Sequence, residues 1–160
     1  MYTVQIAVEP KQIAILAVFG ILIVIFILFA VIRNAKGGKG FQQVKNEYSD
    51  KIVREFNYKY YQGFFTKDEL FIAEKNKRVV SVYAISEIGS VRSSFDVSAR
   101  RWSFALYGDT NHTLKGDVTD GKTRKPRKIG IQYLLKQKEA DELADILIEM
   151  HPNIRRFSMR

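Results

Sequence analysis

Residues 13–32 read IAILAVFGILIVIFILFAVI and contain no charged and no strongly polar side chain. At about 1.5 Å per residue, a helix over this stretch is about 30 Å long, which is the hydrocarbon thickness of a bilayer. Because lipid offers the backbone no hydrogen-bond partner, the stretch is expected to be helical despite its many β-branched residues. It therefore predicts a transmembrane helix over 13–32.

A buried core helix and a cleaved signal peptide are the two other interpretations of this stretch. An uninterrupted apolar run of this length does not suit a core helix in a chain of 160 residues. A signal peptide has an apolar region of about 7–15 residues, preceded by positive charge and followed by a small-x-small cleavage site. Here the run is longer, and Arg33 follows it directly. These features favour an uncleaved, single-pass anchor.

The charges that flank the apolar stretch predict its orientation. The short tail 1–12 carries a single basic residue, Lys11, whereas Arg33, Lys36, Lys39 and Lys45 follow the stretch. Positive charge collects on the cytoplasmic side of a membrane protein. We therefore expect a cell-membrane protein with its N-terminus outside and its C-terminal domain in the cytoplasm.

The segment after the apolar stretch divides into a linker and an amphipathic helix. Residues 33–40 contain three glycines, which predict a flexible Gly/Lys linker. Apolar residues then recur at spacings of three and four, which is the stripe of one helix over 41–57. This candidate face, which would pack on the domain or lie in the membrane interface, consists of Phe41, Val44, Tyr48, Ile52 and Phe56.

From about residue 58 the pattern changes to short strands. In 101–107, Trp102, Phe104 and Leu106 alternate with smaller or charged residues, as a strand with one buried face requires. Seven such strands are expected, and they predict an antiparallel sandwich or barrel. A C-terminal helix over 138–150 follows and ends before Pro152. The remaining residues, 154–160, form a basic tail. The strands are expected at 63–66, 70–74, 79–84, 88–95, 101–107, 113–118 and 129–135.

This pattern resembles bacterial pleckstrin-homology-like domains, in which seven strands are followed by one helix that closes an open corner of a bent sheet. Residues 65–72 (FTKDELFI) and 83–91 (YAISEIGSV) are similar to the segments that open the second strand and join the third and fourth strands of such domains. The resemblance covers 62–153 and places a PH-like domain at 58–153. It implies an α+β, mainly β, fold and a binding or assembly module.

One departure concerns lipid recognition. Lipid-reading domains of this type carry basic residues in the loop between their first two strands, whereas the corresponding 67–69 (KDE) is net negative. This argues against specific phosphoinositide binding. A rival architecture is the curved sheet packed on a helix of membrane-anchored secretion-system assembly factors, which the helix 41–57 would suit.

Positive charge is concentrated outside the apolar stretch. The net charge of +9 resides in 33–160, since 1–32 carries only Glu9 and Lys11. Residues 119–128 predict a long basic loop between two strands, and a further basic group is expected in a hairpin turn. The candidate lipid or partner contacts are Lys122, Arg124, Lys125, Arg127 and Lys128 in the loop, and Lys75, Lys77 and Arg78 in the turn. Arg100 and Arg101 form a third basic group, and the sequence does not say whether the three groups share a face.

Catalytic and metal-binding motifs are not found in the sequence. The chain has no cysteine, and its two histidines, His112 and His151, have no second ligand at helical spacing. Neither a phosphate-binding loop nor a nucleophile elbow is present. We therefore expect no enzyme, no cofactor and no metal.

The expected function is that of a membrane-anchored binding or scaffold module that contacts a protein at the cytoplasmic membrane surface. One alternative is an anionic-lipid surface sensor that uses the basic loop 122–128, since each basic residue near such a surface contributes about 1 kcal/mol. Another is a small prophage-type membrane effector, such as a superinfection-exclusion protein. Nucleic acid is not an expected partner, because no aromatic residues are interleaved in the basic run.

Overall fold

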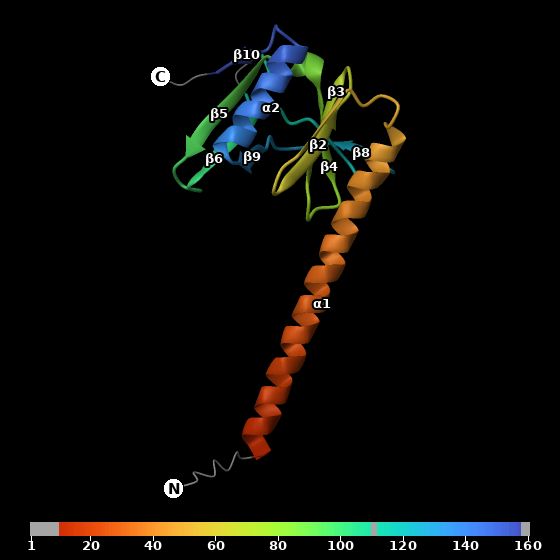
Figure 1. Ribbon diagram of the computed structural model, residues 1–160, viewed down its shortest axis with the longest axis vertical. Helices are drawn as coiled ribbons and strands as arrows, with labels where there is room; N and C mark the ends of the chain where they lie inside the picture. The colour runs from red at the N-terminus through yellow and green to blue at the C-terminus, as the bar shows by residue number, and fades with distance from the viewer. Residues whose placement is uncertain (1–9, 110–111, 158–160) are drawn as a thin grey trace.

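The computed structural model describes residues 10–109 and 112–157. A long helix, α1 (Pro10–Glu47), projects from a mainly β domain and packs against it only near its C-terminal end (Figure 1). The fold is α+β, with ten strands in two sheets among the described residues and a C-terminal helix, α2 (Gln137–Met150). Residues 1–9 of the predicted N-terminal tail and residues 158–160 of the predicted C-terminal tail lie outside the described residues.

One sheet has six strands in the order β1-β2-β3-β4-β7-β8. Its neighbours are antiparallel throughout, so its strands follow one another through hairpins until β7 joins β4. The bounds are β1 Arg54–Asn57, β2 Tyr61–Phe65, β3 Glu69–Glu74, β4 Val80–Ala84, β7 Asp117–Thr119 and β8 Arg124–Pro126.

The second sheet has four strands in the order β10-β5-β6-β9. β5 (Ser90–Asp96) and β6 (Arg101–Tyr107) form a hairpin, β9 (Gln132–Leu135) pairs with β6, and β10 (Arg155–Arg156) runs parallel to β5. The short 3-10 helix η1 (Ile85–Glu87) connects β4 to β5. α2 lies across this second sheet in Figure 1.

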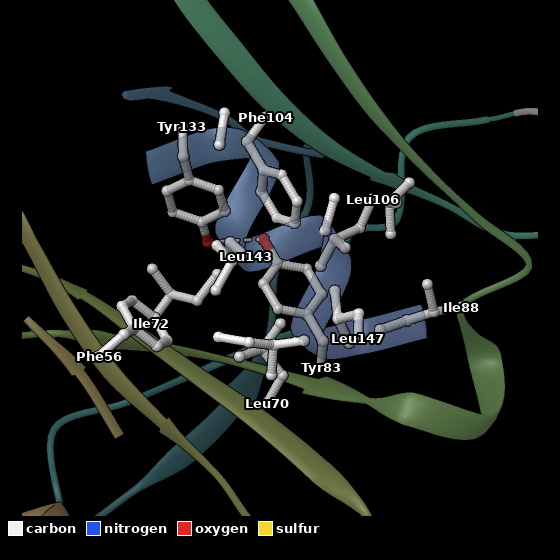
Figure 2. Close-up of a cluster of buried hydrophobic side chains, with 14 of the residues drawn as sticks. Phe56, Leu70, Ile72, Tyr83, Ile88, Phe104, Leu106, Tyr133, Leu143 and Leu147 are labelled. Carbon is white, nitrogen blue, oxygen red and sulfur yellow. Dashed lines mark hydrogen bonds between the residues drawn. The ribbon is translucent and has the colours of Figure 1, made fainter. Parts of the chain in front are cut away.

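The main core fills the space between the two sheets and α2 (Figure 2). Alternate residues of the central strands point inward, for example Leu70 and Ile72 of β3, as the period of two requires. Figure 2 shows the hydroxyls of Tyr83 and Tyr133 meeting inside this core, 2.8 Å apart. The other residues labelled there are Phe56, Leu70, Ile72, Ile88, Phe104, Leu106, Leu143 and Leu147.

The expected fold is an antiparallel sandwich or barrel of seven strands. Two sheets are compatible with a sandwich and not with a barrel, and the described residues form ten strands, six in one sheet and four in the other. Two of the additional strands are β1, in the segment expected to be helical, and β8, in the segment expected to be a loop. The third, β10, lies in the expected tail, where Ile154 is buried. The C-terminal helix is confirmed, one residue longer at its start than predicted.

The junction between the apolar stretch and the domain also differs from expectation. The sequence predicts a flexible linker over 33–40 and a separate helix over 41–57, whereas α1 continues through 33–40 and ends at Glu47. Glycine costs about 1 kcal/mol in a helix interior relative to alanine, but helical segments on both sides offset that cost. The chain then turns at Tyr48–Lys51 before it enters β1.

Candidate membrane-facing surface

The last turns of α1 pack on the outer face of the six-stranded sheet. Phe41 and Val44 are buried there, and the Tyr48 ring packs at a tilt against that of Phe71, with the ring centres 4.7 Å apart. Phe56, the fifth member of the predicted stripe, instead lies in β1 and belongs to the main core. The second cluster comprises Phe41, Val44, Phe64, Phe71, Ala73, Val80 and Val82, with Tyr48 and Ile52 packed against it.

Two contacts fix where α1 first touches the domain. A Cβ on Gly40 would lie 2.2 Å from the carbonyl oxygen of Arg78, so the helix backbone approaches the β3–β4 turn more closely than any side chain allows. Three residues later, the Gln43 side-chain amide donates a hydrogen bond to the Gly121 carbonyl in the β7–β8 turn, at 3.2 Å. α1 therefore meets the hairpin turns before it reaches the middle of the sheet at Tyr48.

Strand register places three turns of this sheet at the same end. Asn57 pairs with Gln62 next to the β1–β2 turn, and the Lys75 amide donates to the Tyr60 carbonyl at 2.9 Å, which joins that turn to the β3–β4 turn. Val80 pairs with Thr119, so the β7–β8 turn lies at this end as well. Because α1 touches this end of the sheet first, this end of the sheet faces back along α1 toward the apolar stretch.

The β5–β6 turn of the other sheet lies beside these turns. The Arg101 guanidinium stacks 5.4 Å from the centre of the Tyr60 ring, and the Lys59 ammonium lies 5.0 Å from the same ring. The Lys59 ammonium, and then the Arg101 guanidinium, lower the pKa of the exposed Tyr60 hydroxyl. Figure 1 shows the β1–β2, β3–β4 and β5–β6 turns along the edge of the domain that faces the N-terminal half of α1.

We call the β1–β2, β3–β4 and β5–β6 turns together the basic turn edge. Its cations are Lys59, Lys75, Lys77, Arg78, Arg100 and Arg101. Of these, Lys77 pairs with Glu74 at 2.6 Å. Three apolar side chains are exposed on the same turns: Tyr60 (43%), Val79 (41%) and Val97 (79%). The edge therefore combines positive charge with exposed apolar tips.

The distance from this edge to the apolar stretch follows from helix geometry. The window long and apolar enough to cross a membrane is Ile15–Ile32, with mean hydropathy 3.5. Gly40 comes eight residues after Ile32 in the same helix, which is a rise of about 12 Å. The polar layer on each side of a bilayer is roughly 5–8 Å thick, so the turn edge would lie at or just above the headgroups if α1 crossed the membrane.

The predicted basic run 122–128 does not form one cluster, because it is a hairpin and not a loop. Arg124 forms ion pairs with Glu69 and Asp117, both at 2.6 Å. Lys122 lies in the β7–β8 turn, where its backbone amide donates a hydrogen bond to the Asp120 carboxylate. Lys125 and Lys128 are exposed. Arg127 is half-buried and, together with Arg124, lines a pocket of about 430 Å³.

Lys59 is the cation of the edge that the sequence analysis does not identify. The helix expected over 41–57 hides the β1–β2 turn in which Lys59 lies. Lys75, Lys77 and Arg78 are predicted candidates, and the structure places their turn on the same edge of the domain as the turn that carries Arg100 and Arg101. The signal that would have found the turn is the alternation of Phe56 and Tyr58 ahead of it.

An open groove of about 630 Å³ runs along α2 on another side of the domain. Arg54 of the edge strand β1 forms one wall, and Asp141, Glu142 and Glu149 of α2 line the other. Arg54 reaches across to Glu149 at 2.8 Å. Burial, and then the Glu142 and Glu139 carboxylates, raise the pKa of the neighbouring Tyr58 hydroxyl. Within the described part of the chain, no three His, Cys, Asp or Glu residues are grouped so as to hold a metal ion.

Comparison of the chain with protein-family models, with curated proteins and with solved structures gave no match.

Proposed function

We propose that this protein is a single-pass, membrane-anchored binding module whose β domain is held at the cytoplasmic surface and binds a protein there. The observation that carries the proposal is the continuity of α1. One helix leads from the apolar window Ile15–Ile32 to the packed residues Phe41 and Val44 without a break.

The continuity of α1 supports an anchor over a cleaved signal sequence. The helix that contains the apolar window also supplies Phe41 and Val44 to a cluster of the folded domain. A cleavage site directly after the window would therefore lie inside a helix and not in an extended segment. The excess of basic residues after the window supports a cytoplasmic position for the domain.

The groove along α2 supports a protein partner. β1 is an edge strand with a single neighbour, β2, and such an edge pairs readily with an extended segment of another chain. The acidic residues Asp141 and Glu142 give the groove negative charge that attracts a basic segment. Because the anchor keeps the domain at high local concentration on the membrane, a weak contact in this groove would suffice.

Photocrosslinking in cells, followed by membrane fractionation, tests both parts of the proposal. A photoreactive residue would replace Glu142 in the groove in one full-length variant and exposed Lys67 in the β2–β3 turn in another. We expect the chain to remain in the membrane fraction after alkaline extraction, with a discrete adduct from position 142 only. Extraction of the chain by alkali would overturn the anchor, and identical adducts from both positions, or none, would overturn the groove.

A further inference from the structure

We propose that the basic turn edge lies on the anionic headgroups of the bilayer that α1 crosses, so that the domain contacts the membrane at a second place. This inference rests on the proposed anchor. It names the lipid surface as the ligand of an edge made of the β1–β2, β3–β4 and β5–β6 turns.

Geometry is the first support. Gly40 touches the β3–β4 turn through Arg78, and the helical rise from Ile32 to Gly40 is about 12 Å. A single helix with its side chains is about 10–12 Å across, so this space is too narrow for a folded protein. Lipid headgroups would occupy it whenever α1 spans the bilayer, which is why a bilayer surface is the occupant that the geometry favours.

Charge is the second support. The edge gathers six cations from three turns that are up to 42 positions apart in the sequence, from Lys59 to Arg101. The acids at the strand ends that flank these three turns are Glu74, which pairs with Lys77, and Asp96, which accepts hydrogen bonds from Ser98 and Ala99. At physiological salt, electrostatic attraction extends about 8 Å from an anionic surface. This distance is comparable to the height of the basic turn edge above the headgroups.

The exposed apolar tips are the third support. Val97 begins the β5–β6 turn with 79% of its surface exposed, and the Lys59 and Arg101 side chains both lie over the Tyr60 ring. Tyrosine with basic neighbours is enriched at the level of membrane headgroups, because its ring is apolar and its hydroxyl is polar. Val97 and Tyr60 are therefore expected to enter the headgroup layer when the cations meet it.

A fluorescent label on a single introduced cysteine can report this contact, because the chain has no cysteine of its own. The full-length protein would carry Val97→Cys, and a matched variant would carry Ile129→Cys, which is similarly exposed (76%) and lies beyond β8, away from the turns. Each would be placed in nanodiscs of phosphatidylcholine alone or mixed with phosphatidylglycerol, with a headgroup-attached quencher. We expect quenching at position 97 in the anionic discs, less in neutral discs, and none at position 129.

Charge variants identify the residues responsible. Lys59→Gln, Lys75→Gln, Arg78→Gln and Arg101→Gln together are expected to abolish the anionic-lipid component, with each removed cation lowering the contact equilibrium about fivefold. A control removes equal charge elsewhere, through Lys67→Gln, Lys115→Gln, Lys128→Gln and Arg155→Gln, and should retain the contact. Fluorescence of Trp102, the only tryptophan, checks that each variant is folded.

Equal quenching in neutral and anionic discs, or quenching that survives the four edge substitutions, would overturn the lipid contact. In either case the protein remains embedded in the nanodisc, so the proposed anchor stands. Failure of the unlabelled chain to enter nanodiscs would instead overturn the anchor, and with it this inference.

Discussion

At the scale of single residues, the most constrained polar groups are the hydroxyls of Tyr83 and Tyr133, which share a hydrogen bond inside the main core (Figure 2). Burial raises the pKa of both hydroxyls, so both are neutral throughout the physiological range. The Ser81 hydroxyl lies close enough to the Tyr133 hydroxyl to lower its pKa, whereas the hydrogen-bond partner found for the Tyr83 hydroxyl is Tyr133. The Tyr83 and Tyr133 hydroxyls are therefore not equivalent, because Tyr133 has Ser81 as a second hydroxyl neighbour.

This asymmetry predicts unequal effects of removing each hydroxyl. Tyr133→Phe leaves the buried Tyr83 hydroxyl without its partner and should lower the free energy of unfolding by about 1–3 kcal/mol. Tyr83→Phe should cost less, because Tyr133 keeps Ser81, and the double variant should cost less than the sum of the two. Urea unfolding of the full-length chain in detergent, followed by Trp102 fluorescence, measures all three. Strictly additive losses would contradict a shared hydrogen bond.

At the scale of elements, the junction between α1 and the β3–β4 turn depends on a missing side chain. Gly40→Ala would place a methyl group 2.2 Å from the Arg78 carbonyl oxygen, and this backbone atom cannot rotate away. Overpacking of this kind costs about 1–3 kcal/mol, more than the helix propensity of alanine returns. We therefore predict that Gly40→Ala lowers domain stability and speeds amide hydrogen exchange at Phe41 and Val44.

Gly20→Ala is the matched control for this prediction. Gly20 lies in the same helix with nothing within 4 Å of the added methyl group, so its substitution should leave the domain unchanged. If Gly40→Ala were as stable as the parent chain, helix propensity would outweigh the close approach. The packing of α1 on the β3–β4 turn would then not require glycine at position 40.

The same junction shows how far the sequence predicts the fold. The apolar helix, the strands β2 to β6 and the C-terminal helix have strong local periodicity and were anticipated. β1 was not, because Phe56 continues the helical spacing of Phe41 to Ile52. Its partner strand follows in the same hairpin: Phe56 pairs with Gly63, seven positions on, whose lack of a side chain makes room for the Phe56 ring.

The candidate surface was partly predictable for a related reason. Basic residues in the β3–β4 and β5–β6 turns are visible in the sequence, but their proximity depends on how the two sheets are arranged. The basic run 122–128 gave a stronger local signal and misled, because Arg124 is neutralised by Glu69, which lies 55 positions away. Local charge density therefore identified cations, while strand register determined which of them share an edge.

At the scale of the whole molecule, the unbroken helix links membrane depth to domain orientation. α1 carries the apolar window, the basic residues after it and the docked stripe in one rigid element. The height and facing of the basic turn edge are thus set by the number of residues between Ile32 and Gly40. A change in that number should move the edge in a calculable way.

Seven helix-forming residues of balanced charge inserted between positions 35 and 36 test this coupling. Seven residues make about two turns, so they preserve the facing of the domain while lifting the edge by about 10 Å, beyond the screening length of about 8 Å. We predict that headgroup quenching at Val97→Cys in anionic nanodiscs is lost, while Trp102 fluorescence is unchanged. The same seven residues added ahead of residue 1 should have no effect. If the contact survived the insertion, the segment 33–40 would be acting as the flexible tether that its glycines suggest, because only a bending linker lets the edge return to the lipid.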